Sequence, residues 1–469
     1  MPGILSLGAY IPRYRLSSSA LSAAWGERGP NLGRPVANHD EDSLTMAHEA
    51  LASVMQGRDP RGLDGLFFAT TTPPYREKSA AGFLATVLDA RRDVYASDFQ
   101  GSLRSFVPAL RAACDALESG SARLVAIGAA DLRPAAPGSA DEISLADAAG
   151  ALLLGSEDAA FVIEGAHTVN EDFYDAWRTE TDPYIRRGDA KFVQEEGYEA
   201  LGVEAAGGVL QAAGLDKADV DRVLLCVPDT RTLRSLARKL GFENRVYPQR
   251  PPASVLGDAG TAAPILALAA EADRLTAGQR VLLLIYGSGC DAVLFRATER
   301  VGSLGGKESW KRESETGRPL EHYGRYLRFR NLLREDAALA PYSSPAVLHR
   351  EEKANLRLYG EKCRRCEAVQ FPPRKVCRAC GAADEFEEFK LSRRGRVFTY
   401  TVDHLAPTPD PPVVMASADL DGGGRFYGQL VDCAPDEVSV GMEVELCFRR
   451  LHTGDGFHNY FWKMRPVLR

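Results

Sequence analysis

The sequence predicts an α/β fold of two similar halves, followed by a small cysteine-rich module and a small β-barrel. Three observations support this prediction. Apolar strands alternate with Ala-rich helical stretches through residues 1–300, which is the pattern of a largely parallel sheet. Two closely spaced cysteine pairs then occur within residues 363–380. Short alternating strands separated by turns fill the remainder, residues 393–469, as in small barrels.

Composition and length narrow the class of protein. The chain has 469 residues, of which 45% are hydrophobic and 26% charged, so disorder, collagen and coiled coil are excluded. At roughly 150 residues per domain, two to four domains are expected. The formal charge of −7 argues against nucleic acid as a partner, because phosphate binding requires a basic face.

The chain shows neither an export signal nor a membrane span. Its first residues lack a basic segment followed by an apolar core, and its longest apolar stretch, residues 259–270, contains Thr and Pro. A membrane span needs about 18 apolar residues. We therefore expect a cytoplasmic protein with no membrane partner. The odd count of nine cysteines favours reduced thiols or a metal site over a disulfide framework.

The order of the secondary-structure signals repeats along the first 300 residues. A strand after an acidic turn is expected at 63–69 and again, 157 residues later, at 220–226. The helix end, turn and strand of 117–127 recur at 275–284 with an offset of 157 or 158. Any two βαβ units look alike to some degree, but the constant offset favours an internal duplication with a pseudo-twofold axis.

Each half contains a small-residue turn that we expect between a strand and a helix, at 97–102 and 257–261. Such a turn directs backbone N–H groups and the positive end of a helix dipole to one point. An oxyanion or a thioester carbonyl could bind there. The candidate binding residues are Gly101, Gly257, Gly260, Gly287 and Ser288.

Residues 8–15 resemble the start of 3-hydroxy-3-methylglutaryl-CoA synthases and their bacterial relatives in the thiolase superfamily. The segments 70–75 and 286–289 and the Gly257 turn support the resemblance, which covers about residues 1–300. It implies the duplicated five-layered thiolase fold, a CoA thioester as substrate and carbon–carbon bond chemistry. It also implies a homodimer formed through this domain.

The catalytic positions of that family differ in this chain. The family's acylated Cys, at the strand-to-helix turn of the first half, corresponds to Asp98, and the nearest thiol, Cys114, is expected within a helix. The family's His corresponds to Cys226, and no His occurs between His167 and His322. The ordinary acyl-enzyme route is therefore not expected.

The remaining family positions also differ, with Thr71 near the place of the acid–base Glu and Asp258 in place of an Asn. A carboxylate is a far poorer acyl acceptor than a thiolate. The chemistry left is non-covalent: the two turns would stabilise a thioester enolate while Asp98 or Asp258 moves a proton. This would suit aldol, retro-aldol or retro-Claisen reactions, or decarboxylation.

Asp98, the two cysteines Cys226 and Cys290, and the thiolase-like region as a whole each have an alternative, structural interpretation. Asp98 is also a favourable helix N-cap, and for Cys226 and Cys290 a small buried residue is the favoured interpretation over a nucleophile. The thiolase-like part as a whole could be a scaffold that kept the fold and lost the activity. Such a scaffold would couple partner acyl-CoA enzymes or channel acyl-CoA between them.

Residues 363–380 contain the spacing C-x2-C-x10-C-x2-C. Two such tight turns bring four thiolates into a tetrahedron, which is the ligand set of a closed, structural Zn²⁺ site. An iron–sulfur or redox pair and two disulfides are the alternatives, and both are disfavoured by two paired turns in one short segment. The predicted zinc ligands are Cys363, Cys366, Cys377 and Cys380.

The strands expected at 395–402, 413–420 and 442–448 suit an OB-fold barrel. The cysteine module and barrel together resemble the rubredoxin-like zinc-ribbon/OB family that accompanies thiolase-like enzymes in acyl-CoA metabolism. The resemblance implies an accessory module that docks against the thiolase-like subunit and helps to admit or hold the CoA thioester. The same architecture elsewhere binds oligonucleotides.

The predicted organisation has five parts. Between the thiolase-like region and the ribbon, the composition becomes charged, with a helix expected at 323–333 whose basic residues form a solvated face or contact CoA phosphates. The predicted boundaries are 1–165 and 166–300 for the two thiolase-like halves, 301–346 for a linker and helix, 347–392 for the zinc ribbon and 393–469 for the OB-fold barrel.

Overall fold

The chain divides into two units in a computed structural model. Unit 1 comprises residues 1–37, 42–85 and 90–323, and unit 2 comprises residues 38–41, 86–89 and 324–469. The structure describes residues 1–26, 33–246, 256–304, 307–333, 343–454 and 456–468. Two stretches of the predicted linker and helix, 305–306 and 334–342, lie outside the described residues.

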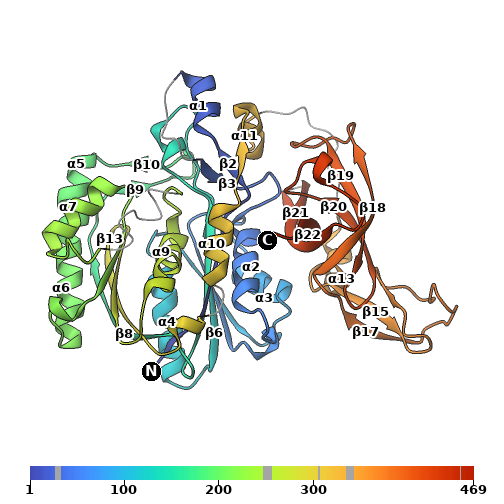
Figure 1. The fold of residues 1–469 in the computed structure, drawn as a ribbon, viewed down its shortest axis with the longest axis horizontal. Coiled ribbons are helices and arrows are strands. Elements are labelled where there is room, and N and C mark those ends of the chain that lie inside the picture. The colour runs from blue at the N-terminus through green and yellow to red at the C-terminus, as the bar shows by residue number, and fades with distance from the viewer. Residues whose placement is uncertain (27–32, 247–255, 305–306, 334–342, 455, 469) are drawn as a thin grey trace. The chain divides into compact units, whose positions relative to one another are not determined.

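In the described part of unit 1, nine strands form one sheet in the order β11-β12-β13-β8-β1-β7-β6-β4-β5 (Figure 1). Strands β5, β4 and β6 run parallel, as do β11 and β12, whereas β1, β7, β8 and β13 pair antiparallel. The strands are β1 (Gly3–Tyr10), β4 (Gly65–Thr70), β5 (Tyr95–Gln100), β6 (Leu124–Asp131), β7 (Ala148–Gly155), β8 (Phe161–Asn170), β11 (Arg222–Cys226), β12 (Arg280–Tyr286) and β13 (Gly289–Ala297).

Helices cover both halves of this sheet and fill the space between them. Helix α2 (Ser43–Val54) packs on β1, β6 and β7, and α6 (Gly202–Ala213) packs on β8 and β13. Between the halves lie α4 (Phe106–Glu118) and α9 (Ala263–Glu271), each against strands (Figure 1). This arrangement confirms the predicted five-layered thiolase-like fold.

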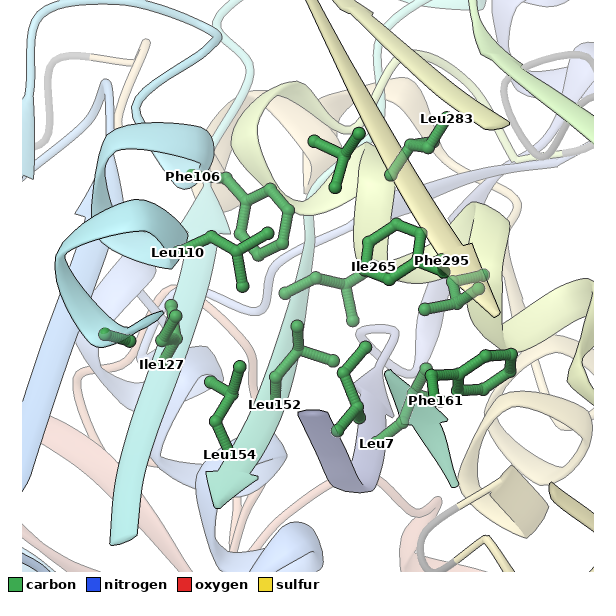
Figure 2. Close-up of a cluster of buried hydrophobic side chains, with 14 of the residues drawn as sticks. Leu7, Phe106, Leu110, Ile127, Leu152, Leu154, Phe161, Ile265, Leu283 and Phe295 are labelled. Atoms are coloured by element: carbon green, nitrogen blue, oxygen red, sulfur yellow. The ribbon is translucent and has the colours of Figure 1, made fainter. Parts of the chain in front are cut away.

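The hydrophobic core forms where α4 and α9 meet the strands (Figure 2). Phe106 of α4 and Ile265 of α9 are each 1% exposed, and they share one cluster with Leu152 and Phe295. Helix α9 has apolar residues on all sides, APILALAAE, which is the composition of a helix buried all round. A middle layer between two half-sheets requires such a helix.

The predicted duplication is visible in individual hydrogen bonds. The Asp64 carboxylate accepts the N–H of Arg123 at 2.8 Å, and the Asp221 carboxylate accepts the N–H of Arg280 at 2.8 Å. Asp64 and Asp221 are 157 residues apart in the sequence, and so are the donors Arg123 and Arg280. Each bond fixes the start of a central strand to its neighbour in one half, so the two halves repeat the same local chemistry.

Two local predictions need correction. Strand β5 continues to Gln100, so the turn expected at 97–102 begins at Gly101, whose φ of 92° allows the chain to leave the strand. The linker expected after residue 301 instead contains helix α10 (Lys307–Glu315) and strand β14 (Arg318–Leu320), which pairs with β2 (Tyr14–Leu16). Pairing with the first half stabilises a segment whose charged composition alone predicts a linker.

Unit 2 contains the two predicted small modules. A three-stranded sheet has the order β16-β15-β17, and a closed barrel has the order β18-β19-β20-β22-β21 in the described residues. The sheet comprises β15 (Tyr359–Cys363), β16 (Val369–Gln370) and β17 (Phe386–Lys390). The barrel comprises β18 (Arg394–Asp403), β19 (Val413–Leu420), β20 (Arg425–Leu430), β21 (Glu443–Gly454) and β22 (Phe457–Pro466).

The remaining elements are short. The helix expected at 323–333 forms as α11 (Tyr323–Phe329). None of the helices in the described ranges combines the length and apolar character that crossing a membrane requires. The other segments include α1 (Ser18–Trp25), β3 (Arg34–Val36), α3 (Ala80–Val87), β9 (Ala176–Trp177), β10 (Arg186–Arg187), α5 (Ala190–Phe192), α7 (Thr230–Leu240), α12 (Pro345–Arg350) and α13 (Glu352–Asn355).

Candidate active site and metal centre

Two cavities of unit 1 lie where parallel strands of both halves end. Ligands of α/β folds bind at the carboxyl ends of such strands. The cavities have volumes of about 50 Å³ and about 200 Å³, and Leu103, Asp175 and Ala176 line both. The smaller is also lined by Arg187, Tyr198, Cys226, Asp258, Gly260 and Tyr286, among others. The larger is also lined by Thr71, Gly101, Ser102, Arg133, Trp177, Arg178, Ile185, Gly287 and Ser288.

The turn between β5 and α4 places Ser102 and Leu103 at the cavities. The Ser102 hydroxyl donates to the Gly287 carbonyl at 3.2 Å and accepts the N–H of Arg104 at 3.2 Å. Leu103, which has an apolar side chain, lines both cavities. The turn at which the resemblance implies an acylated Cys therefore presents an apolar group and a hydroxyl that is already hydrogen-bonded.

Asp98 lies within β5, away from this turn. Its carboxylate accepts the N–H groups of Ala80 at 3.0 Å and Ala81 at 2.8 Å. It thus caps the first turn of α3, which leaves orphan N–H donors at its start, and it lines neither cavity. The capping interpretation of Asp98 fits the geometry, although the capped helix is α3 and not the helix that follows β5.

Asp258 lines the smaller cavity as part of an ion-pair cluster. It lies 3.1 Å from Arg133 Nη2 and 3.4 Å from Arg187 Nη2. Burial alone would raise the pKa of Asp258, but the two guanidinium groups outweigh burial and lower the pKa to about 2. Asp258 is therefore a permanently charged carboxylate at neutral pH, well suited to hold arginines and poorly suited to accept a proton.

Cys226 lies at the end of β11 and lines the same cavity. Burial and the charge of Asp258 raise the pKa of the Cys226 thiol. Burial likewise raises the pKa of Cys290 in β13. Because the thiolate is the nucleophilic form, both cysteines are held in their unreactive form.

Asp175 is a candidate that sequence reasoning missed. It lies between β8 and β9, is 9% exposed and lines both cavities. Its carboxyl oxygens accept the N–H groups of Ala176 at 2.7 Å and Ser288 at 3.4 Å. Burial raises the pKa of Asp175, which brings a carboxyl group closer to the range of a general base. No motif marks this position, because an acidic residue after a strand is common.

The predicted oxyanion residues divide between the cavities. Gly101, Gly287 and Ser288 line the larger one, Gly260 lines the smaller one, and Gly257 lines neither. The N–H groups of Gly260, Gly287 and Ser288 already donate to Asp258, to the Gly289 carbonyl and to Asp175. Arg133, Arg178 and Arg187 supply the positively charged side chains that line these cavities.

Thr71 and Gly260 meet at a buried carboxylate, Asp131, which is 0% exposed. Asp131 accepts the N–H of Thr71 at 2.6 Å and the N–H of Thr261 at 2.8 Å. A Cβ on Gly260 would lie 2.2 Å from Asp131 Oδ2, so only glycine fits there. The hydrogen bonds to Asp131 join the ends of β4 and β6 to the start of α9. Thr71 therefore has a structural role at the cavity wall.

The four predicted zinc ligands converge in unit 2. Their sulfurs all lie within 4.8 Å of one another, with Cys363 and Cys380 3.7 Å apart and Cys366 and Cys377 3.6 Å apart. A tetrahedron with Zn–S bonds of about 2.3 Å has edges of about 3.8 Å. The backbone N–H groups of Cys380 and Ala379 lower the pKa of the Cys377 thiol to about 7. The donor set and its spacing therefore fit Zn²⁺.

Comparisons with known proteins agree with both units. Residues 350–387 match the family described as "ChsH2, rubredoxin-like zinc ribbon domain", and residues 389–449 match "ChsH2, C-terminal OB-fold domain". The hydroxymethylglutaryl-CoA synthase of Methanopyrus kandleri is 29% identical over 344 residues, which are 71% of this chain and 98% of the relative. That of Methanocaldococcus jannaschii is 28% identical over 316 residues, 65% of this chain and 91% of the relative.

Solved structures show the same fold. MvaS in complex with 3-hydroxy-3-methylglutaryl coenzyme A has a TM-score of 0.60 at 22% identity, covering 73% of this chain and 94% of that one. The 3-oxoacyl-[acyl-carrier-protein] synthase III of Aquifex aeolicus has a TM-score of 0.54 at 22% identity, covering 63% and 100%. The chain thus combines a thiolase-like fold, similar to that of hydroxymethylglutaryl-CoA synthases, with a zinc ribbon and an OB-fold domain of the ChsH2 type.

Proposed function

We propose that the chain is an acyl-CoA enzyme that makes or breaks a carbon–carbon bond by proton transfer, without an acyl-enzyme intermediate. One observation carries this proposal. The β5–α4 turn presents Leu103 to both cavities, and the thiol of Cys226, which lines the smaller cavity, is held protonated. A site with this arrangement keeps a binding cavity and lacks a thiolate to acylate.

The proton would be moved by Asp175. It is the cavity-lining carboxyl with a raised pKa, whereas the pKa of Asp258 is lowered to about 2. Asp175 would remove a proton from the carbon next to the thioester, and the positive charge of Arg187 at the smaller cavity would stabilise the enolate oxygen. Asp258, which pairs with Arg187 and Arg133, is a positioning residue in this scheme.

A CoA thioester is the substrate class favoured by the relatives. The solved structures of similar fold include one "in complex with 3-hydroxy-3-methylglutaryl coenzyme A" and one "complexed with CoA". Proton removal next to a thioester starts aldol and Claisen additions, and return of a proton to the same carbon completes a retro-aldol cleavage.

Two measurements on the full-length protein test this function. With acetyl-CoA in D₂O, we expect exchange of the acetyl protons for deuterium and no acyl adduct by intact-mass spectrometry. A stable adduct on Cys226 would contradict the proposal. Binding of acetyl-CoA with no proton exchange and no turnover would favour the alternative function, a scaffold or channelling protein for partner acyl-CoA enzymes.

We also propose that the chain forms a homodimer through its thiolase-like unit, as the family resemblance implies. Light scattering coupled to size-exclusion chromatography should give about twice the 50.9 kDa chain mass. A monomer at micromolar concentration would contradict this proposal.

A further inference from the structure

Two arginines line the larger cavity, and the first, Arg133, is deeply buried. Its side chain is 3% exposed, and Nη2 lies 3.1 Å from Asp258. Its Nε is buried and has no hydrogen-bond partner among the described residues. Leaving a buried donor unpaired is costly, so this guanidinium retains hydrogen-bonding capacity for an acceptor that the described chain does not provide.

The second arginine, Arg178, follows β9 and is exposed at the cavity. It donates to two neutral acceptors, the carbonyls of Thr71 at 2.5 Å and Pro183 at 3.5 Å. It forms no ion pair within the described ranges, in contrast to Arg187, which pairs with Asp141 at 2.9 Å. Its charge also interacts with the buried Asp131, and its exposed guanidinium is accessible to an anion from solution.

The charges that line the larger cavity are the guanidinium groups of Arg133, which pairs with Asp258, and Arg178, together with one carboxyl, Asp175. A planar guanidinium matches a carboxylate with two parallel hydrogen bonds. The wall of the larger cavity is thus suited to an anion, and its arginine donors favour a carboxylate.

The position of the larger cavity indicates whether CoA or a second, smaller substrate carries the anion that binds there. The larger cavity shares Leu103 and Asp175 with the smaller one, so an anion there lies next to the proton-transfer group. The phosphates of CoA are separated from the thioester by the long pantetheine arm. At about 200 Å³, the cavity is smaller than the roughly 300–1,000 Å³ of drug-sized sites, and it suits a small reaction partner.

We propose that this cavity binds a small 2-oxo carboxylate as the second substrate, with its carboxylate on Arg133 and Arg178 and its carbonyl carbon towards Asp175. This inference rests on the proposed function and names the second substrate of that same site. It also accounts for a turn without a nucleophile, since addition of a thioester enolate to a ketone requires no acyl-enzyme.

The reaction balances with the groups present. The Asp175 carboxylate takes one proton from the carbon next to the thioester, and the electron pair of that C–H bond forms the new bond to the 2-oxo carbon. The C=O π pair moves onto oxygen, which takes the proton back from Asp175. The product is a 2-hydroxy carboxylate still attached to CoA, and the reverse steps cleave it.

Binding of 2-oxobutyrate to the full-length protein tests the inference, with 2-butanone as the probe that lacks the carboxylate. By saturation-transfer NMR, 2-oxobutyrate should bind at least about tenfold more tightly than 2-butanone. Arg178→Gln should weaken 2-oxobutyrate binding by about tenfold or more, and Arg133→Lys, which keeps the charge and loses the planar fork, should weaken it as well. The matched control is Arg186→Gln, an exposed arginine of β10 paired with Asp182, which should leave binding unchanged.

Two results would overturn the inference. One is unchanged 2-oxobutyrate binding in both Arg178→Gln and Arg133→Lys. The other is an equal weakening of acetyl-CoA and free CoA by these variants, which would assign the arginines to a CoA phosphate. Proton exchange of acetyl-CoA alone needs no second substrate, so exchange without 2-oxobutyrate binding rejects only this inference. Binding of 2-oxobutyrate without exchange contradicts only the proposed function.

Discussion

At the scale of single residues, the site contains two cavity-lining carboxyls in opposite environments. Asp175 is buried without an ion pair among the described residues, and its pKa is raised. Asp258 lies between two arginines, and its pKa is lowered to about 2. Environments that separate the pKa values of two carboxyls also separate their roles, which is why we propose Asp175 as the proton carrier and Asp258 as the residue that holds the arginines.

Replacing Asp175 tests the first of these roles. Asp175→Asn keeps the side-chain shape and removes the base, so exchange of acetyl-CoA protons should fall by at least about 100-fold. Because the base must be ionised and burial raises its pKa, wild-type exchange should increase with pH through an apparent pKa above the ordinary value of about 3.9. Deuterium incorporation followed by mass spectrometry between pH 4 and 9 measures both.

The control is Asp98→Asn, which changes a carboxylate that lines neither cavity. It should keep the exchange rate and its pH profile, at some loss of stability at α3. Full exchange in Asp175→Asn, or loss of exchange in a folded Asp98→Asn variant, would refute the assignment.

Replacing Asp258 tests the second role through stability. Its folded pKa of about 2 lies below the unfolded value of about 3.9. Its ionised form therefore contributes stability above pH 4, and this contribution is lost as the pH falls from about 4 towards 2. Asp258→Asn should lower the free energy of unfolding at pH 7 by about 3 kcal/mol, because the buried Arg133 and the half-buried Arg187 lose their carboxylate.

Urea unfolding at pH 7 and pH 3 measures this effect. The variant should lose less stability than the wild type between the two pH values. The exposed Asp172→Asn should behave as the wild type at both. An Asp258→Asn variant as stable as the wild type at pH 7 would show that the arginines need no counter-charge.

At the scale of elements, the two halves of the thiolase-like unit repeat the hydrogen bonds at the starts of their strands. They do not repeat the residues of the candidate site. The Asp64 bond to the Arg123 N–H and the Asp221 bond to the Arg280 N–H have the same length and the same place in each half. The site turns differ, because the β5–α4 turn carries Leu103 and the turn before α9 carries Asp258. The duplicated halves thus preserve strand pairing and diverge where strands end.

This repetition predicts matched losses of stability. Asp64→Ala and Asp221→Ala should each lower the free energy of unfolding by about 1 kcal/mol, the value of one hydrogen bond. Asp64→Ala should cost at least as much, since Asp64 also pairs with Arg91 at 3.2 Å. Chemical denaturation measures both, with the exposed Glu299→Ala as control. A loss at one position only would show that the two bonds are not equivalent.

At the scale of the whole molecule, four cysteine sulfurs from two separate turns come together in unit 2. All four lie within 4.8 Å of one another. Since a structural zinc contributes directly to folding, metal content and the stability of this unit should change together.

Elemental analysis should therefore give about one zinc per chain, and Cys377→Ser should reduce it to near zero. Chelation should lower the thermal stability of the unit 2 transition in calorimetry. Cys433→Ser, which changes a thiol outside the cluster, should keep the zinc. A chain that keeps full thermal stability after its metal has been removed would contradict a structural role.

Sequence patterns were sufficient for the α/β class, the duplication, the four-cysteine cluster and the small barrel, whereas the five-layered thiolase-like fold was implied by the family resemblance. The first and the last two rest on short-range regularities, which are period-two and helical apolar spacing and two C-x2-C turns, and the duplication rests on an offset of 157 or 158 residues. Predicted strands such as 413–420 coincide with β19, because alternating apolar residues between turn residues leave one favourable backbone state.

The chemistry of the candidate active site was decided by the tertiary structure. The sequence placed Asp98 at the catalytic turn and left Asp175 unmarked, whereas in the fold Asp98 caps α3 and Asp175 lines both cavities. Burial, pKa and ion pairing depend on groups distant in the chain, such as Arg133 and Asp258, 125 residues apart. The sequence alone determined which elements form and which four thiols gather, and three-dimensional packing decided which carboxyl can carry a proton.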